Sequence, residues 1–252
     1  MIELLPILLP ALAAGLLVLA THVPMGQQVL KRGIIFIDLA IAQIAALGAV
    51  LAATHHELAH LPLVQWWLPL LFALAGSGLI ALLERHAKAE LEALIGCLYV
   101  LSAVAAMLLL SGDPHGGEQL KQLLSGQILW TDWSSLLLPT LVTALLLALL
   151  WWRPSLLEGA SFYPLFALMI TIAVPMLGVY LVFASLIIPA LAVARGSGVT
   201  ALLGGYGVGL GGYLLGLIAS AWWDLPSGAA IVMALAAVAL LWRGLCGLLS
   251  QA

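Results

Sequence analysis

The chain has very few charged residues. Of its 252 residues, 8% are Asp, Glu, Lys or Arg, whereas 64% are hydrophobic and the mean hydropathy is +1.20. A soluble globular domain carries about 25% charged residues, so this chain lacks the polar surface that a water-soluble fold needs. Its long apolar runs also lack the alternation that is typical of a membrane β-barrel. We therefore expect lipid to be its main solvent.

Cysteines, nucleotide-binding sequences and catalytic constellations are scarce or absent. The two cysteines, Cys97 and Cys246, lie in or beside apolar runs, which indicates neither a disulfide nor a metal pair. No GxxxxGK[ST] sequence is present, so energy for any pumping must come from another chain. The Gly-Ser-Gly triplets at 76–78 and 196–198 have no histidine inside an apolar span to act as a base. We therefore expect no enzymatic activity. An intramembrane enzyme is the alternative from another class, and a catalytic pair facing a cavity would distinguish it.

The apolar runs predict an all-α polytopic membrane protein that forms one domain, residues 1–252, with eight or nine transmembrane helices. The clear runs cover residues 4–21, 34–53, 64–83, 91–111, 134–152, 200–221 and 227–245. The stretch 162–194 is too long for one crossing and contains Pro175 and Gly178. Because proline ends or kinks a helix, we expect two short crossings that turn there. A re-entrant run would reduce the count to eight.

Basic residues are distributed unevenly between the two sides of these runs. Seven of the eight Lys and Arg residues fall in alternate gaps or near the end of the last run, and Lys121 is the exception; the seven are Lys31, Arg32, Arg85, Lys88, Arg153, Arg195 and Arg243. Cytoplasmic loops of membrane proteins carry an excess of Lys and Arg. The pattern predicts an amino terminus outside and a carboxyl terminus inside.

An outer loop contains the strongest local signal for metal chemistry. His55, His56, Glu57 and His60 fall within six residues. On a helical turn, His56 and His60 would share one face, as in many zinc sites. A polar solvated loop is the alternative interpretation of the same residues.

Two acidic residues outside this loop are candidate pathway residues. Asp38 lies inside an apolar run, where a carboxylate is costly and usually faces a cavity or a partner. Hydration at the cytoplasmic interface is its alternative explanation. Asp224 lies at an outer span end, where it is either a pathway residue or the amino-terminal cap of the last helix.

Several segments, taken in order, resemble the permease subunits of bacterial ABC importers for zinc, manganese and iron. They are GQQVLKRGIIFIDLAIAQIAALG at 26–48, ELEALIG at 90–96, LLSGQIL at 123–129, GVYLVFASLIIPALAVA at 178–194 and GLIASAWWDLPSGAAIV at 216–232. The resemblance implies a type II ABC importer-like homodimer in the bacterial cytoplasmic (inner) membrane. It also implies cytoplasmic ATPase subunits and a periplasmic or surface metal-binding protein as partners. We expect no permanently bound cofactor and no nucleic-acid partner, and the metal is cargo.

The resemblance also implies roles for particular residues. Asp224 matches the acidic position at the outer end of the pathway, and Ser220 and Gln43 fall on the pathway. The metal-ligand positions of the second span fall on Leu39 and Gln43, and Asp38 points about 100° away from the first of them. The stretch 190–198 would contain the helix that couples to the ATPase, with the residues Pro189, Ala190, Ala192, Ala194, Arg195 and Gly196.

The expected cargo is a divalent transition metal. Zinc is favoured over manganese or iron because imidazole suits zinc, whereas manganese prefers oxygen ligands. A permease for a metal chelate or a cobalamin-like cofactor is the runner-up, since neither Leu39 nor Gln43 is a strong metal ligand.

Overall fold

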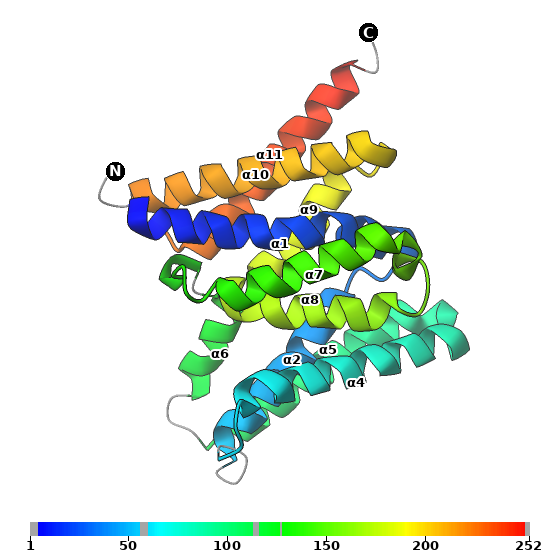
Figure 1. Ribbon diagram of the computed structural model, residues 1–252, viewed down its shortest axis with the longest axis vertical. Coiled ribbons are helices and arrows are strands. Elements are labelled where there is room, and N and C mark those ends of the chain that lie inside the picture. Colours follow the sequence, from blue (N-terminus) through cyan, green and yellow to red (C-terminus); the bar gives the residue numbers. More distant parts are fainter. Residues whose placement is uncertain (1–4, 56–59, 113–115, 127, 250–252) are drawn as a thin grey trace.

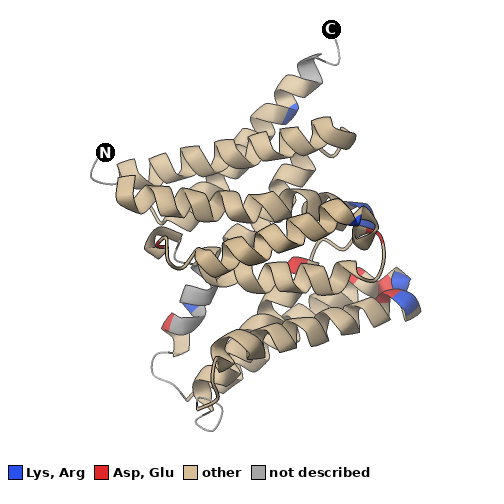
Figure 2. Cartoon of the chain, viewed as in Figure 1, with Lys and Arg blue, Asp and Glu red and all other residues tan. Residues whose placement is uncertain are grey.

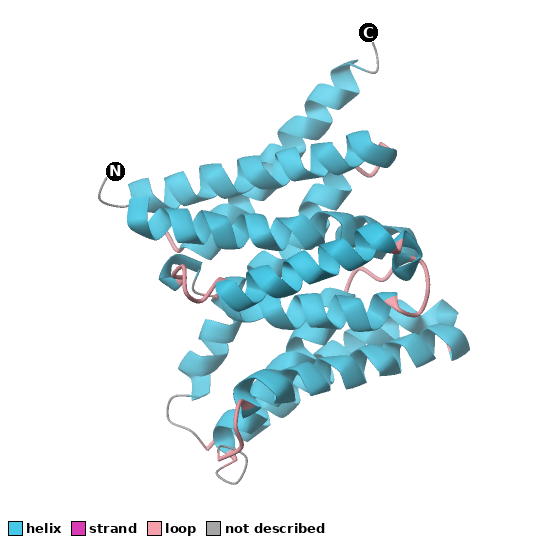
Figure 3. Cartoon of the chain, in the orientation of Figure 1, coloured by secondary structure: helices cyan, strands magenta, loops and turns pink. Residues whose placement is uncertain are grey.

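A computed structural model describes residues 5–55, 60–112, 116–126 and 128–249. Throughout these ranges the chain is built from helices and turns, and they contain no β-strand (Figure 3). The apolar helices are α1 (Leu5–Arg32), α2 (Ile37–Thr54), α4 (Val64–His86), α5 (Leu91–Leu110), α7 (Leu137–Trp152), α8 (Phe162–Leu177), α9 (Val179–Ala192), α10 (Gly198–Trp223) and α11 (Ser227–Leu249). Six of these are long and apolar enough to cross a membrane, and α7, α8 and α9 are shorter. The prediction of an all-α polytopic membrane protein is confirmed.

The helices run back and forth between two sides of the bundle (Figure 1). The helix α6 (Gly116–Ser125) and the 3-10 turn η3 (Ile128–Trp130) connect α5 to α7 on one side. The turn η2 (Lys88–Glu90) joins α4 to α5, and η4 (Pro154–Leu157) follows α7. The helices α2, α4 and α5 form one end of the bundle, α10 and α11 form the other, and α1, α7, α8 and α9 lie between them (Figure 1).

The stretch 162–194 forms two short helices with a break at the predicted place. Helix α8 ends at Leu177, and Gly178 has a φ of 78° before α9 begins at Val179. A positive φ is readily adopted only by glycine, so this residue permits the sharp break between the two helices. Pro175 lies in the last turn of α8, whereas Pro189 is buried within α9.

Helix α1 is longer than the sequence predicts. It was expected to end near residue 21, but it continues through Pro24 to Arg32. Tight packing against α9 and α10 keeps it helical beyond a residue that often ends a helix, as happens in membrane helices with close neighbours. His22 therefore lies inside a helix and is fully buried, so the expectation that no histidine occupies an apolar span is wrong.

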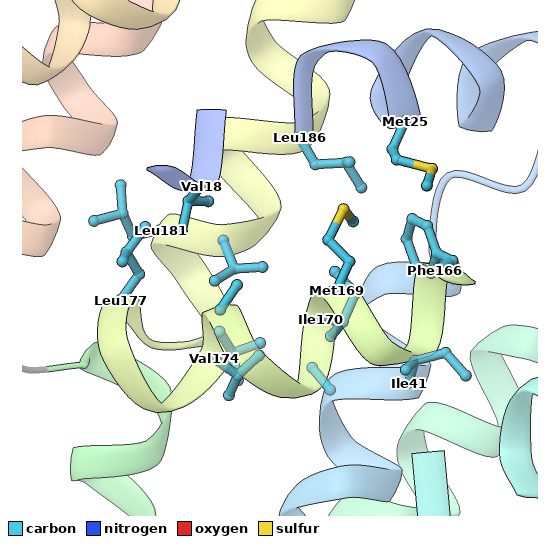
Figure 4. Close-up of a cluster of buried hydrophobic side chains, with 14 of the residues drawn as sticks. Val18, Met25, Ile41, Phe166, Met169, Ile170, Val174, Leu177, Leu181 and Leu186 are labelled. Carbon is cyan, nitrogen blue, oxygen red and sulfur yellow. The ribbon is translucent and has the colours of Figure 1, made fainter. Parts of the chain in front are cut away.

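The core is centred on α8. Side chains of α8 pack between residues of α1, α2 and α9, as Figure 4 shows for Val18, Met25, Ile41, Phe166, Met169, Ile170, Val174, Leu177, Leu181 and Leu186. In contrast, Leu101, Leu108, Leu141 and Leu145 each expose about two thirds of their surface. Exposed leucines on apolar helices indicate faces that meet lipid.

The glycine-rich segment 204–216 packs closely against neighbouring helices, as predicted. A Cβ atom on Gly209 would overlap Leu19 of α1, and one on Gly216 would overlap Ile231 of α11. Tyr213 of α10 covers Gly15 of α1, and its hydroxyl lies 2.7 Å from the Ser185 hydroxyl of α9. Small residues thus let three helix backbones approach each other.

We predict that Gly26→Ala destabilises the chain by about 1–3 kcal/mol, because the added methyl group would collide with the Leu186 backbone carbonyl of α9. Gly207→Ala is the matched control, since a Cβ atom there meets nothing within 4 Å. That change should be neutral or stabilising by about 0.5–1 kcal/mol. Thermal unfolding in detergent measures both variants, and equal melting temperatures would contradict the close contact between α1 and α9.

Charged residues cluster on one side of the bundle. Figure 2 shows Lys and Arg at the ends of α1 and α4 and after α7, all on the right of the view. Helix α6, which carries Lys121, lies on the opposite side. The arrangement of these helices therefore agrees with the alternation in the sequence.

Candidate functional site

A buried carboxylate in the first turn of α2 is the most unusual polar group in the described part of the chain. Asp38 exposes 1% of its surface, and neither carboxylate oxygen has a hydrogen-bond partner. Gln43, in the second turn of the same helix, exposes 2%, and its Oε1 is also unpartnered. Buried polar atoms nearly always have partners, and ionisable residues inside membranes usually serve function. These oxygens are therefore candidate ligands for a cation.

Asp38 and Gln43 do not face the same neighbour. Five residues along an α-helix correspond to a rotation of about 140° and a rise of about 7.5 Å. The two side chains therefore project from different faces of α2, and they cannot chelate one ion together. Either residue would need ligands from another helix or from a second chain.

The outer-loop histidines lie at the far end of the same helix. His55 is exposed and follows the last residue of α2, and His60 is exposed before α4. His56 and Glu57 lie outside the described residues. Seventeen residues separate Asp38 from His55, which is about 25 Å along a helix. Asp38 and the outer loop therefore belong to different places in the molecule.

Asp224 ends α10 and is exposed. Its backbone has a φ of 51°, and its N–H donates to the Ser220 carbonyl. The sequence predicts an amino-terminal cap of the last helix as one role of this residue, but Asp224 instead occupies the carboxyl-terminal cap of α10. Its carboxylate is thus free to meet solvent at the turn before α11.

Ser220 is engaged in the same turn. It is buried, and its hydroxyl donates to the Leu225 carbonyl at 2.7 Å, while the Leu225 N–H donates to the Ser220 carbonyl at 3.2 Å. These bonds connect the end of α10 to the start of α11. The hydroxyl has a structural partner, although the sequence predicts a place on the pathway.

We predict that Ser220→Ala destabilises the chain by about 1 kcal/mol, because the Leu225 carbonyl loses its hydroxyl donor. Metal uptake per correctly folded molecule should be unchanged, because the Ser220 hydroxyl is engaged by the Leu225 carbonyl. Uptake normalised to the amount of protein in the membrane measures this. A total loss of uptake with an unchanged melting temperature would show that Ser220 is a pathway residue.

The predicted coupling segment contains no helix of its own. Ala190 and Ala192 belong to the last turn of α9, and a turn at 193–195 leads directly to α10. Pro189, Ala190 and Ala192 are buried, so they cannot contact a soluble partner. The exposed part is the turn itself, with Ala194, Arg195 and Gly196. The expectation of a separate helix at 190–198 is therefore wrong, because α9 runs on through the small residues.

Two hollows flank this turn. One, of about 330 Å³, lies between the turn and α11 and is bordered by Arg195, Trp242 and Arg243. The other, of about 300 Å³, lies towards the end of α1 and is bordered by Gln27 and Lys31. The turn thus lies between two pockets that are each bordered by basic residues, at one end of the bundle.

A largely buried cation at the end of α1 was not evident from the sequence. Arg32 donates to the Leu157 and Gly159 carbonyls, both at 3.0 Å, and its Nη1 lies 3.5 Å from the Glu84 carboxylate. Its guanidinium carbon lies 4.6 Å from the centre of the Phe162 ring. Arg32 therefore joins α1, α4 and the start of α8 (Figure 1). In the sequence, Arg32 lies next to Lys31, and both were interpreted only as basic residues that mark the cytoplasmic side.

Asp132, in the loop before α7, also has a structural role. The Ser135 backbone N–H donates to its carboxylate at 2.7 Å, and the Ser134 hydroxyl donates at 3.0 Å. These hydrogen bonds hold the pKa of the Asp132 carboxyl below its usual range. They also explain the turn that begins α7.

A large apolar cavity opens between η3, α9 and α11. It has a volume of about 690 Å³, and its lining includes Trp130, Tyr180, Phe183, Ile188 and Met233. It lies beside the break between α8 and α9, since Gly126 in its wall packs against Leu177 and Gly178. Cavities of this size accommodate organic ligands, which are larger than a bare metal ion.

Asp38, His55, His60 and Asp224, the predicted metal ligands that the structure describes, do not form one metal site. Among the residues that the structure describes, no three His, Cys, Asp or Glu side chains are close enough to hold a metal ion. Asp38, the outer loop and Asp224 occupy three separate locations.

The helical bundle, with its long apolar helices and exposed leucines, defines a multi-pass membrane protein. The sequence profile of the ABC 3 transport family matches residues 4–162, which is more than half of the chain, and the chain belongs to this family. The predicted resemblance to ABC importer permeases is thus confirmed. The family consists of transport proteins, in agreement with the expectation that the chain is not an enzyme.

Solved structures share the fold over nearly the whole chain. PsaBC from Streptococcus pneumoniae, in complex with Fab, matches with a TM-score of 0.73 and 19% identity over 96% of this chain and 93% of that one. A transporter described as of the metal-chelate ABC type, in an inward-facing conformation, matches with a TM-score of 0.65 and 20% identity over 96% and 85%. A search of curated proteins finds no match.

Proposed function

We propose that the chain is the membrane permease of an ATP-driven importer for a divalent transition metal, with zinc as the cargo. The observation that carries this proposal is Asp38, a buried carboxylate with two unpartnered oxygens in a helix of an ABC permease. A cation passing along α2 would satisfy these oxygens. Ionisable residues inside a membrane often mark substrate or ion pathways.

Zinc is favoured by the outer residues. His55 and His60 are exposed at the mouth of α2, where imidazoles receive zinc more readily than manganese. Asp224 provides an exposed acid on the same side of the bundle, where α10 ends (Figure 1). The cargo would first meet these residues and later Asp38, at the opposite end of α2.

The proposal includes an orientation and partners. The basic ends of α1 and α4 and the turn with Arg195 face the cytoplasm, with the amino terminus outside and the carboxyl terminus inside. A cytoplasmic ATPase contacts the turn at 194–196, because the chain has no nucleotide-binding sequence. Two copies of the chain form the pathway, and an outer metal-binding protein delivers the cargo.

We predict that the two ends of α4 label from opposite sides of intact bacterial cells. In a background of Cys97→Ser and Cys246→Ser, Leu61→Cys should react with an impermeant maleimide, because Leu61 is exposed on the proposed outer side. Lys88→Cys, exposed at the basic end, should react only after the cells are opened. Reaction of both positions in intact cells would contradict the orientation.

A metal chelate is the second candidate cargo, and the 690 Å³ cavity favours it. The apolar and aromatic lining suits an organic ligand, whereas a bare ion needs charged or polar ligands that this lining lacks. Uptake by the chain with its co-purifying ATPase, in proteoliposomes, separates the two candidates. Free zinc should be taken up, and a tight chelator in excess should stop the uptake. If uptake requires the chelator, the cargo is the complex and zinc import is excluded.

A further inference from the structure

The imidazole of His22 has one ring nitrogen engaged and one without a partner. It is fully buried in the middle of α1. Its Nδ1 lies 2.9 Å from the Val18 carbonyl oxygen and 3.3 Å from the Thr21 hydroxyl, which itself donates to that carbonyl. With oxygen acceptors on this side, the hydrogen resides on Nδ1, and Nε2 presents a bare lone pair. That Nε2 is buried and unpartnered.

A cavity beside His22 has the size of one ion or one water molecule. It lies between α1, α7 and α8, has a volume of about 10 Å³, and is bordered by Thr21, His22, Thr143, Met169 and Met176. Figure 4 shows the Met169 side chain directed from α8 towards α1, between Val18 and Met25. His22 borders this space, and Nε2 is its unpartnered ring nitrogen.

The side chains around this cavity are uncharged, and two of them carry soft thioethers. Those with donor atoms are His22, Thr21, Thr143, Met169 and Met176, and no Asp, Glu, Lys or Arg borders the space. Thioethers select Cu(I) among the biological metals, whereas divalent ions carry a larger desolvation cost that carboxylates normally offset. An Nδ1–H bonded to a backbone carbonyl is also the arrangement that orients a metal-binding histidine.

We propose that this cavity binds one soft monovalent cation of the Cu(I) class, held by His22 Nε2 together with the sulfurs of Met169 and Met176. The site is distinct from the divalent cargo and does not depend on the proposed transport function. A bound ion links α1 to α8, so it stabilises the arrangement of helices that the structure shows.

Silver(I), which has the same charge and softness, is the probe for this site. The chain with Cys97→Ser and Cys246→Ser, in lipid nanodiscs, is titrated calorimetrically, because these exposed thiols would otherwise bind silver. His22→Ala and Met176→Leu should each lower silver binding by about one ion per chain or weaken it at least about tenfold, which is 1.4 kcal/mol. Met107→Leu, at an exposed methionine of α5, should change nothing.

The melting temperature provides a second readout. It should rise with silver concentration in the cysteine-free chain and in the Met107→Leu control, but not in Met176→Leu, which conserves volume and should fold. Zinc at the same concentration should not displace the ion. Equal silver stoichiometry, affinity and thermal response in all variants would overturn the proposal and leave the cavity to a water molecule.

Discussion

Asp38→Asn should abolish most metal uptake while leaving the chain at least as stable as before. The carboxylate is buried with both oxygens unpartnered, so it contributes nothing to the fold that its amide isostere would lose. Mutation of the groups that hydrogen-bond to metal ligands lowers metal affinity or activity by about 10- to 100-fold. Loss of a ligand carboxylate itself should cost at least as much. We therefore expect uptake to fall by about that factor, with an unchanged or higher melting temperature.

The matched control for this prediction is Asp224→Asn. It removes the same charge, but from an exposed position whose structural contribution is the backbone cap of α10. From the sequence alone, the change at Asp224 is expected to be the more harmful of the two, and the burial of Asp38 reverses this order. Zinc uptake in proteoliposomes measures both. Normal uptake by Asp38→Asn would remove α2 from the pathway.

Arg32→Ala should be the most destabilising single change at the charged end of the bundle. It removes two hydrogen bonds, the ion pair with Glu84 and the contact with the Phe162 ring, and it leaves two carbonyls and a carboxylate without their partner. Removal of one partner of a largely buried ion pair costs about 3–5 kcal/mol. We expect a loss in that range, seen as a lower melting temperature and less protein in the membrane.

Lys31→Ala is the control for Arg32, because it removes a neighbouring positive charge that is exposed. Its effect should stay within about 0.5 kcal/mol. Arg32→Lys keeps the charge but not the planar fork that reaches both carbonyls, so it should fall between the two. If Lys31→Ala and Arg32→Ala lowered the melting temperature equally, the contacts of Arg32 would not stabilise the fold. Both residues would then act only as positive charges that set the membrane orientation.

The sequence was sufficient for the architecture, because hydropathy and the positive-inside pattern are strong signals in a membrane protein. The break at Gly178 was predictable, since Pro175 and a glycine interrupt a stretch that is too long for one span. The close packing of α10 was predictable from its glycines. The length of α1 was not, because tertiary packing overrode the local effect of Pro24.

The candidate site was less predictable, because burial and pairing are three-dimensional properties. The sequence marked Asp38 and Gln43 as candidates but could not show that their oxygens lack partners. It also could not show that Ser220 is engaged by Leu225, or that Arg32 reaches across to the residues before α8. The coupling segment was misassigned as a helix because its small residues extend α9 instead.

The central claim is that this chain moves metal only when a separate ATPase drives it. The most direct measurement is zinc accumulation in proteoliposomes that contain the chain with or without its co-purifying ATPase, with ATP supplied on the side of Arg195. We predict accumulation against a gradient only when both proteins and ATP are present, and no ATP hydrolysis by the chain alone. Accumulation without the ATPase, or ATP hydrolysis by the purified chain, would contradict the account.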